Sequence, residues 1–205
     1  MTRTIADIAI SLDGYVTGPD AGPENGLGTG GEALHAWAFS DDPDDRRVLR
    51  DSARRSGAVV LGRRLFDVVD GPQGWDDETG YGAGENVDTP AFVVVTSSPP
   101  TAVRLTHLDW TFVTTGLADA VAVARERTQA ASAERATDLD TVVMGGGATI
   151  ATALAAGLVD VLSLHLAPVI LGGGTPLFRG GPPLTLVQRS VTPTTTVTHL
   201  VYEVA

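Results

Sequence analysis

Cysteine and lysine are both missing from this 205-residue sequence, although it contains 14 arginines. Without cysteine the chain has no disulfide bond, no thiolate metal site and no cysteine nucleophile. Without lysine it has no Schiff-base chemistry, no phosphate-binding P-loop lysine and no catalytic tyrosine–lysine pair. The histidines do not lie at the spacing of metal ligands, so we expect no metal site. They are His35, His107, His165 and His199.

The sequence also lacks any apolar run that approaches the ~20 residues of a membrane span. Its N-terminus lacks the apolar core and cleavage site of a signal peptide, so we expect a cytoplasmic protein with no membrane partner. The formal net charge of −11 argues against nucleic-acid binding. Half of the arginines fall between residues 46 and 64. Those from 46 to 55 can pair with Asp44, Asp45 and Asp51, so we interpret them as a solvated helix face.

Hydrophobic residues make up 43% and charged residues 19% of the chain, a composition typical of a globular protein. A length of 205 residues lies within the range of one domain and is enough to bury a substantial core. Because neither an internal repeat nor a shift in composition divides the chain, we expect a single domain over residues 1–205.

Short apolar runs alternate with segments of helical spacing along the chain. Strands are predicted within 3–16, 58–62, 91–98, 110–116, 139–145, 159–171, 184–191 and 195–204, and helices within 41–56, 63–71, 117–133 and 147–157. This alternation, with continuous apolar runs in the middle strands, predicts an α/β fold whose mostly parallel sheet is covered on both faces. The last two strands lie close in sequence, so we expect them to form an antiparallel edge.

Three glycine clusters compete as phosphate-binding loops. "GLGTGG" at 26–31 matches the spacing G-x-G-x-x-G but follows no strand, so we interpret it as part of a loop. "ILGGGTPLF" at 170–178 leads into no clear helix and favours a turn. "VVMGGGATIATAL" at 142–154 has the required order of strand, glycines and helix, and free N–H groups at a helix start suit a phosphate. Its residues alone fit a tight turn and a phosphate cradle equally well.

Two further strand ends carry groups that suit a phosphate. Gly62 is followed by Arg63 and Arg64, whose planar guanidinium groups match phosphate oxygens. "VVVTSS" places the hydroxyls of Thr96 and Ser97 at another strand end. Ligands of parallel sheets bind beyond the carboxyl ends of the strands, so these ends together indicate a dinucleotide site.

The motifs "SLDGYV", "VLGRRLFD", "VVVTSS", "VVMGGG" and "APVILGGGTPLF" follow one another in this order over nearly the whole chain. In order and spacing the sequence resembles the dihydrofolate reductase-like family, and most of all the branch with the RibD C-terminal reductase domain of riboflavin biosynthesis. The resemblance implies a dihydrofolate reductase-like fold with a central, mainly parallel eight-stranded sheet and flanking helices. It also implies NADPH as hydride donor.

The resemblance assigns roles to particular positions. In the family, the glycine pair at the pyrophosphate often carries a cis peptide bond, and this pair matches Gly145 and Gly146. The implied cofactor-binding residues are Ile10, Val16 and Thr17 at the nicotinamide end, Gly62, Arg63 and Arg64 at the Gly-Arg motif, Thr96 and Ser97 at the adenosine phosphate, and Gly145, Gly146, Gly147, Ala148 and Thr149 at the pyrophosphate.

The sequence departs from the family pattern at three points. Leu65 stands where the family often has a threonine, which removes one hydroxyl contact to phosphate. Asp44 or Asp45 lies near the place of the acid that folate reductases carry on the helix after the first loop. The absence of cysteine excludes the zinc deaminase activity that often accompanies the riboflavin reductase.

The sequence also suggests candidates for catalysis and substrate binding. Asp13 follows the first strand and is our candidate proton donor, with a turn aspartate as the alternative. Trp37 and Phe66 could stack on a flat substrate ring or pack in the core. His165 alternates with Ser163 on a strand, so we expect it on a sheet face or in a subunit contact.

These observations favour an NADPH-dependent reductase of a small pterin- or pyrimidine-like heterocycle, similar to dihydrofolate reductase or to 5-amino-6-(5-phosphoribosylamino)uracil reductase. The alternative is a nucleotide-binding protein of the same fold without turnover. We expect a homodimer in which residues 161–178 contribute to the interface.

Overall fold

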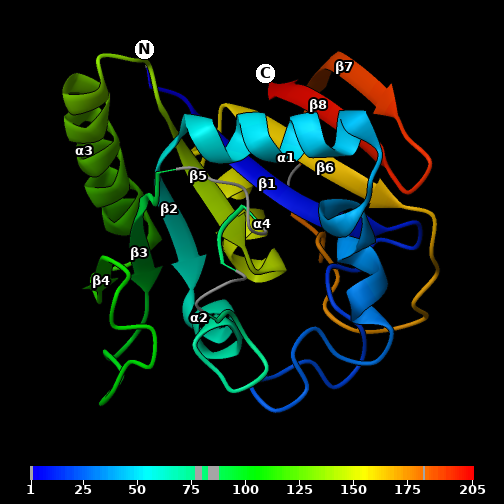
Figure 1. The fold of residues 1–205 in the computed structure, drawn as a ribbon, viewed down its shortest axis with the longest axis horizontal. Helices are drawn as coiled ribbons and strands as arrows, with labels where there is room; N and C mark the ends of the chain where they lie inside the picture. The colour runs from blue at the N-terminus through cyan, green and yellow to red at the C-terminus, as the bar shows by residue number, and fades with distance from the viewer. Residues whose placement is uncertain (1, 77–79, 83–87, 182) are drawn as a thin grey trace.

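Eight strands form a single sheet in the computed structural model, which describes residues 2–76, 80–82, 88–181 and 183–205. The strands are β1 (Thr4–Ser11), β2 (Ser56–Gly62), β3 (Ala91–Val95), β4 (Trp110–Val113), β5 (Asp140–Gly145), β6 (Val161–Ala167), β7 (Leu186–Pro193) and β8 (Thr198–Val204). Their order across the sheet is β4-β3-β2-β5-β1-β6-β8-β7 (Figure 1). The segment 72–90, for which the sequence predicts a polar, glycine-rich loop, lies partly outside the described residues.

The six strands from β4 to β6 run parallel, whereas β6–β8 and β8–β7 pair antiparallel. The predicted mostly parallel sheet with an antiparallel C-terminal edge is therefore confirmed. Strand β6 ends at Ala167, earlier than predicted, because Pro168 has no backbone N–H to donate to a ladder.

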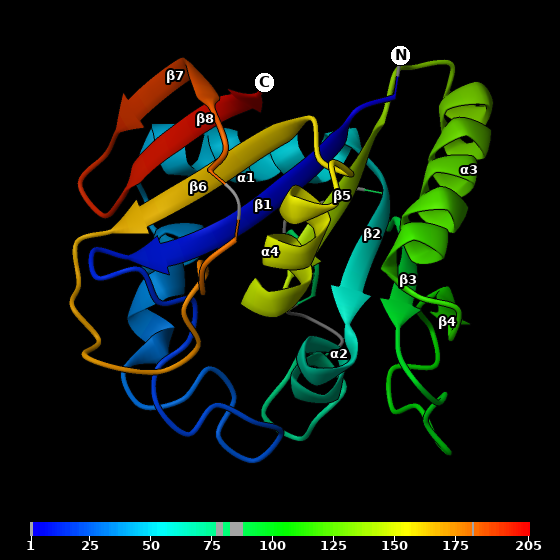
Figure 2. The same ribbon diagram turned by 180° about the vertical axis from the view of Figure 1, so that it is seen from behind.

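Helices cover both faces of the sheet. The helices α3 (Leu117–Arg135) and α4 (Gly147–Ala155) stand in front of it in Figure 2, while α1 (Pro43–Arg55) and the 3₁₀ helix η1 (Gly31–Phe39) stand in front in Figure 1. The short helix α2 (Arg63–Val69) lies at the carboxyl end of β2. None of the helices in the described part of the chain has the length and apolar character that crossing a membrane requires.

Alternate side chains of the central strands build a core on each face. Val60 and Val143 pack with residues of α3 and α4, whereas Val59 and Val142 pack with Phe66 of α2 on the opposite face. These strand residues are at most 3% exposed. Burial on both faces explains why the strands read as continuous apolar runs.

The 3₁₀ helix η1 was not predicted. Its buried residues Gly31, Leu34 and Trp37 recur every three positions, which is the period of a 3₁₀ helix and not the 3.6-residue period of an α-helix. It begins after Gly30, whose φ of 73° is a conformation that glycine adopts readily. This helix places His35 and Trp37 over β1 and β6.

Helix α1 begins as its sequence predicts. The Asp42 side chain accepts a hydrogen bond from the backbone N–H of Asp44 at 3.0 Å, and Pro43 occupies the first turn. Asp44 also pairs with Arg47 at 2.8 Å on the solvated face. The expectation that Asp45 pairs with arginine was wrong. Its side chain is 0% exposed and points inward, where it binds hydroxyl and imidazole groups.

Candidate active site

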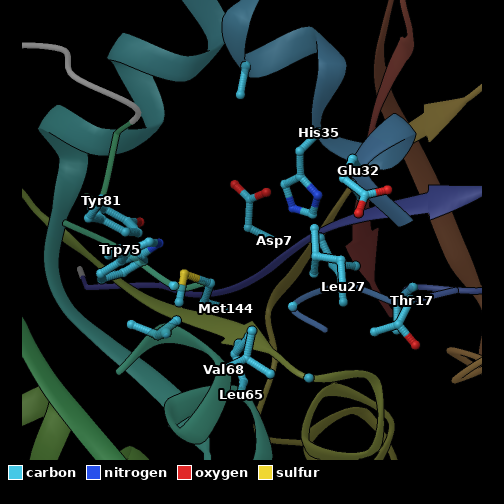
Figure 3. Close-up of a pocket in the computed structure, with 18 of the residues that line it drawn as sticks. Asp7, Thr17, Leu27, Glu32, His35, Leu65, Val68, Trp75, Tyr81 and Met144 are labelled. Carbon is cyan, nitrogen blue, oxygen red and sulfur yellow. The ribbon is translucent and has the colours of Figure 1, made fainter. Parts of the chain in front are cut away.

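A cavity of about 610 Å³ opens on the sheet face that η1 and α1 cover. Its floor comes from β1 and β5, and its walls come from η1, α1, α2 and the segment that follows α2 (Figure 3). The volume suits a small ligand, and most of the lining is apolar, as in small-molecule sites generally. The large apolar or aromatic side chains labelled there are Leu27, Leu65, Val68, Trp75, Tyr81 and Met144.

Two buried polar atoms beside this cavity lack a hydrogen-bond partner within the described structure. They are Nδ1 of His35 and Nε1 of Trp37, and both residues line the cavity. Burial, with a smaller contribution from the charge of His165, lowers the pKa of His35 to about 4. His35 is therefore a neutral imidazole at pH 7. Buried polar groups are normally paired, so these two unpaired atoms distinguish the η1 side of the cavity from its apolar walls.

Asp7 of β1 brings a carboxylate into the cavity (Figure 3). Its side chain is 18% exposed, with Oδ1 2.6 Å from Nε2 of His165. The Ser52 hydroxyl donates to Oδ2 at 2.9 Å. Burial acts to raise the pKa of Asp7, but the charge and hydrogen bond of His165 and the Ser52 hydroxyl outweigh burial and lower it. Asp7 is therefore ionised at neutral pH.

A second carboxylate lies at the far end of a chain of side chains that begins at Asp7. Nδ1 of His165 is 2.7 Å from Nδ1 of His199, and Nε2 of His199 is 2.9 Å from Oδ1 of Asp45. Asp45 does not line the cavity. Burial raises its pKa, but the hydrogen bonds from Ser40, Thr196 and His199 outweigh this effect and lower it.

The family pattern suggested Asp44 or Asp45 as the acid of the substrate pocket, and neither residue lines the cavity. Asp44 lies on the solvated face of α1, and Asp45 is buried against His199. The carboxylates that do line the cavity are Asp7, Glu24 and Glu32.

The predicted residues of the nicotinamide end divide between cavity and core. Val16 and Thr17 line the cavity, and Thr17 Oγ1 also accepts a hydrogen bond from the N–H of Thr175 at 3.0 Å. Ile10 does not line it. It is 6% exposed and packs in the core on the α4 side of the sheet.

The glycine stretch after β5 combines a turn with an open surface. The Gly145–Gly146 peptide bond is cis, as the resemblance implies, and Gly145 has a φ of 124° that favours glycine. A Cβ on Gly147 would lie 2.9 Å from Cγ2 of Val16, so the chain permits no side chain there. A Cβ on Gly146 would meet no protein atom within 4 Å, and Gly146 lines the cavity. A ligand can therefore approach the backbone at Gly146.

The remaining predicted cofactor residues gather at neighbouring strand ends. A Cβ on Gly62 would lie 2.3 Å from Oγ1 of Thr149, so the ends of β2 and β5 adjoin. Arg63 donates to the carbonyl of Ser98 at 2.7 Å and to Oγ1 of Thr96 at 3.4 Å, which joins α2 to the end of β3. The exposed members of the set are Arg64, Ser97 and Ala148.

Two candidates from the sequence lie away from the cavity. Phe66 is 2% exposed, and its ring packs edge-on against Trp110 and Phe112, so no face is available to a substrate ring. Asp13 is exposed, and its carboxylate accepts hydrogen bonds from the backbone N–H groups of Leu171 and Gly172. Trp37, by contrast, does line the cavity.

Sequence reasoning missed Asp7, His35 and the role of His165. One signal was present, because Asp7 is an acid in the middle of the apolar run "IADIAI". A charged residue in a strand buried on both faces needs a partner. Among the described residues, no group of three or more histidine, aspartate and glutamate side chains is placed to hold a metal ion.

Comparison with known proteins gives a consistent picture. The model of the family described as the RibD C-terminal domain matches residues 3–200. A putative riboflavin biosynthesis protein from Shewanella sp. PV-4 superposes with a TM-score of 0.67 at 21% identity, covering 100% of this chain and 99% of that one. Dihydrofolate reductase from Enterococcus faecalis, solved with NADP(H), has a TM-score of 0.57 at 14% identity, and the match covers 98% of this chain and 96% of that one.

A third solved structure is larger than this chain. The deaminase and 5-amino-6-(5-phosphoribosylamino)uracil reductase from Thermotoga maritima has a TM-score of 0.59 at 17% identity, and the match covers 100% of this chain but 57% of that one. At these identities the structures establish a common fold. No curated protein matches the sequence.

Proposed function

The chain belongs to the RibD C-terminal domain family, and from this membership and the geometry of the cavity we propose that it is an NADPH-dependent reductase. The substrate is a small pterin- or pyrimidine-like heterocycle, which receives a hydride. The observation that carries this proposal is that one cavity connects the open backbone at Gly146 with an apolar pocket that contains Asp7 and His35. Cofactor and substrate sites must adjoin in this way for direct hydride transfer.

The residues at the carboxyl ends of β2, β3 and β5 fit a dinucleotide. The open surface at Gly146 and the helix start at Gly147 suit the pyrophosphate. Arg64, with Arg63 close to Thr96, suits the 2′-phosphate of NADPH. The bound cofactor supplies the hydride, so the protein has only to bind, orient and exclude water.

The other end of the cavity fits a flat ring with polar edges. Trp75, Tyr81 and Met144 offer apolar contacts, and burial keeps Tyr81 un-ionised by raising its pKa. Asp7 accepts hydrogen bonds from ring or exocyclic N–H groups, and neutral His35 can donate or accept one. A substrate with N–H and carbonyl groups on one ring, such as a pyrimidine or pterin, provides hydrogen-bond partners for both Asp7 and His35.

Two measurements test this proposal. Calorimetry should show that NADPH binds and is preferred over NADH, because only NADPH carries the 2′-phosphate. Oxidation of NADPH should be stimulated by dihydrofolate or by 5-amino-6-(5-phosphoribosylamino)uracil. Equal affinities for the two cofactors would contradict the role of the arginines. Tight NADPH binding with no turnover of either compound would favour the alternative, a nucleotide-binding protein of the same fold.

A further inference from the structure

Four buried or half-buried side chains from four elements form a continuous row. Asp7 lies on β1, His165 on β6, His199 on β8 and Asp45 on α1. The row depends on strand register, because His165 and His199 are paired directly across the β6–β8 ladder. The successive distances are 2.6, 2.7 and 2.9 Å, so each neighbour lies at hydrogen-bond distance.

The row requires a defined number of protons. Three hydrogen bonds join two carboxylates and two imidazoles, and each bond needs one proton. Two neutral imidazoles supply only two, because each carries a single N–H. The third proton makes one imidazole positively charged, and the row then holds three protons with a net charge of −1.

The surroundings support a single positive charge between two carboxylates. The pKa values of Asp7 and Asp45 are both lowered, so both carboxyls are ionised. Burial first, and then the charge of His165, lowers the pKa of His199, which disfavours a second imidazolium. The Trp37 ring lies 4.2 Å from His165 between ring centroids, where its π face can stabilise a cation.

The row meets the cavity at its Asp7 end. Asp7 and His165 both line the cavity, but the side chain of Asp7 is 18% exposed, whereas those of His165, His199 and Asp45 are at most 5% exposed. The other titratable groups that line the cavity are His35, Glu24, Glu32 and Tyr81. His35 and Tyr81 are neutral at neutral pH because their pKa values are shifted away from it.

We propose that the row Asp7–His165–His199–Asp45 stores the proton that the reduction consumes, and that Asp7 delivers it to the substrate. This inference rests on the proposed function. Asp7 is then a catalytic residue, and His199 and Asp45 are positioning residues that act through His165.

The step balances in electrons and protons. A hydride from the reduced nicotinamide dinucleotide forms a C–H bond at the substrate carbon, and the electron pair of the C=N bond moves to nitrogen. In the same step the Asp7 carboxylate passes on to that nitrogen the proton that Nε2 of His165 gives up. The row falls from three protons to two, its charge changes from −1 to −2, and exchange with solvent restores the third proton.

The first experiment measures the pH dependence of single-turnover NADPH oxidation with 5-amino-6-(5-phosphoribosylamino)uracil. The rate should fall as pH rises and the row loses its third proton. Asp45→Asn removes a negative charge that stabilises this proton, so the midpoint should move about one unit to lower pH. The matched control is Asp140→Asn. Asp140 is a buried carboxylate that pairs with Arg3 and Arg55, outside the row, so its loss should leave the midpoint in place.

Asp7→Asn tests whether the row delivers its proton to the substrate through Asp7. It should lower the rate about 100-fold, the typical contribution of a general acid, and abolish the pH dependence. An unmoved midpoint in Asp45→Asn, or an Asp7→Asn rate within about twofold of the wild-type rate, would overturn the proposal, because a purely structural row predicts both results.

A second measurement does not depend on turnover. Ring ¹⁵N–¹H NMR spectra of the cofactor-free protein at neutral pH should show three ring N–H protons on His165 and His199 together. Two ring protons would mean that both imidazoles are neutral, and the proton store would be refuted. If NADPH is not oxidised with any substrate but three protons are seen, the proposed function fails while the proton count of the row stands.

Discussion

The carboxylate of Asp13 accepts a hydrogen bond from the backbone N–H of Gly172 over 2.7 Å, which ties the turn after β1 to the loop after β6. The Ser11 hydroxyl donates to the same carboxylate at 2.6 Å. This bond first, and then the backbone N–H groups of Gly172 and Leu171, lower the pKa of Asp13 despite partial desolvation. The donors to Asp13 are a hydroxyl and two backbone N–H groups, which do not give up protons at neutral pH, and Asp13 does not line the cavity, so it is poorly suited to supply the proton.

The prediction for Asp13 follows from this geometry. Asp13→Asn should keep the rate of hydride transfer within about twofold of wild type, whereas loss of a general acid costs about 100-fold. It should reduce protection of the Leu171 and Gly172 amides, because an amide nitrogen replaces one acceptor oxygen. Single-turnover kinetics and amide hydrogen exchange measure the two effects. A large loss of rate with unchanged exchange would return Asp13 to the role of proton donor.

The second prediction concerns Gly146. A Cβ at this position would meet no protein atom within 4 Å, so Gly146→Val should fold with little change in thermal midpoint. It should lose NADPH binding, because the valine methyl groups would occupy the space that the pyrophosphate needs. The control is Gly22→Val, since a Cβ at Gly22 also meets open space but lies outside the glycine stretch. Calorimetry with both variants measures their affinity for NADPH. A normal affinity in Gly146→Val would mean that this stretch is a turn and does not bind the pyrophosphate.

Most of the sheet could be predicted because its strands are buried on both faces. Val59 and Val60 point to opposite faces, yet both are 0% exposed, and such a strand leaves a continuous apolar run in the sequence. The glycine stretch at 145–147 was recognisable for a similar local reason, since strand, turn and helix start follow one another directly. Where the role of a residue depends only on its near neighbours in the sequence, that role can be predicted from the sequence.

The side-chain contacts of the candidate site were less predictable, because they join residues that are far apart in the sequence. His165 and His199 are 34 residues apart, and they meet only because β8 is antiparallel to β6 in one register. A shift of one residue would direct the side chains to opposite faces. His35 was missed because η1 has a three-residue period, which matches neither the pattern of an amphipathic α-helix nor that of a strand. Phe66 was ambiguous because an aromatic residue at a helix start suits a ligand or a core equally.

The third prediction concerns assembly. In Figure 2, α3 and α4 cover the sheet only as far as β1, and on this face no helix in the described part of the chain lies over β6, β8 and β7. Leu164, Leu166 and Tyr202 are only partly buried there, and Val187 and Val191 of β7 are exposed. Exposed apolar patches of this kind mark interaction sites.

We therefore expect a homodimer that buries this region together with Ile170 and Phe178, which are 73% and 55% exposed. Sedimentation equilibrium at micromolar concentration should give twice the chain mass. Phe178→Glu should weaken the dimer at least tenfold, while Phe39→Glu, at an exposed phenylalanine on η1, should not. A wild-type monomer would contradict the prediction.

The last prediction concerns the stability of the protein in mild acid. The pKa of His35 is lowered to about 4 in the folded state, chiefly by burial, whereas an unfolded histidine titrates near 6.5. Between these two values the unfolded chain binds more protons than the folded one, so the free energy of unfolding falls as pH is lowered through this window. Above the unfolded pKa, His35 is neutral in both states and contributes no pH dependence.

Replacing His35 by asparagine should therefore reduce the pH dependence of stability. Between pH 7 and pH 5, the titration of His35 should lower the free energy of unfolding of the wild-type protein by about 2 kcal/mol. The His35→Asn protein should not show this part of the decrease. Urea unfolding of both proteins at the two pH values measures the difference, and His35→Gln repeats the test with a longer amide. The titration of His199 is common to all the proteins and cancels in the comparison. Equal losses in wild type and both variants would mean that the His35 imidazole is protonated in the folded cavity, and that it does not serve the substrate as a neutral partner.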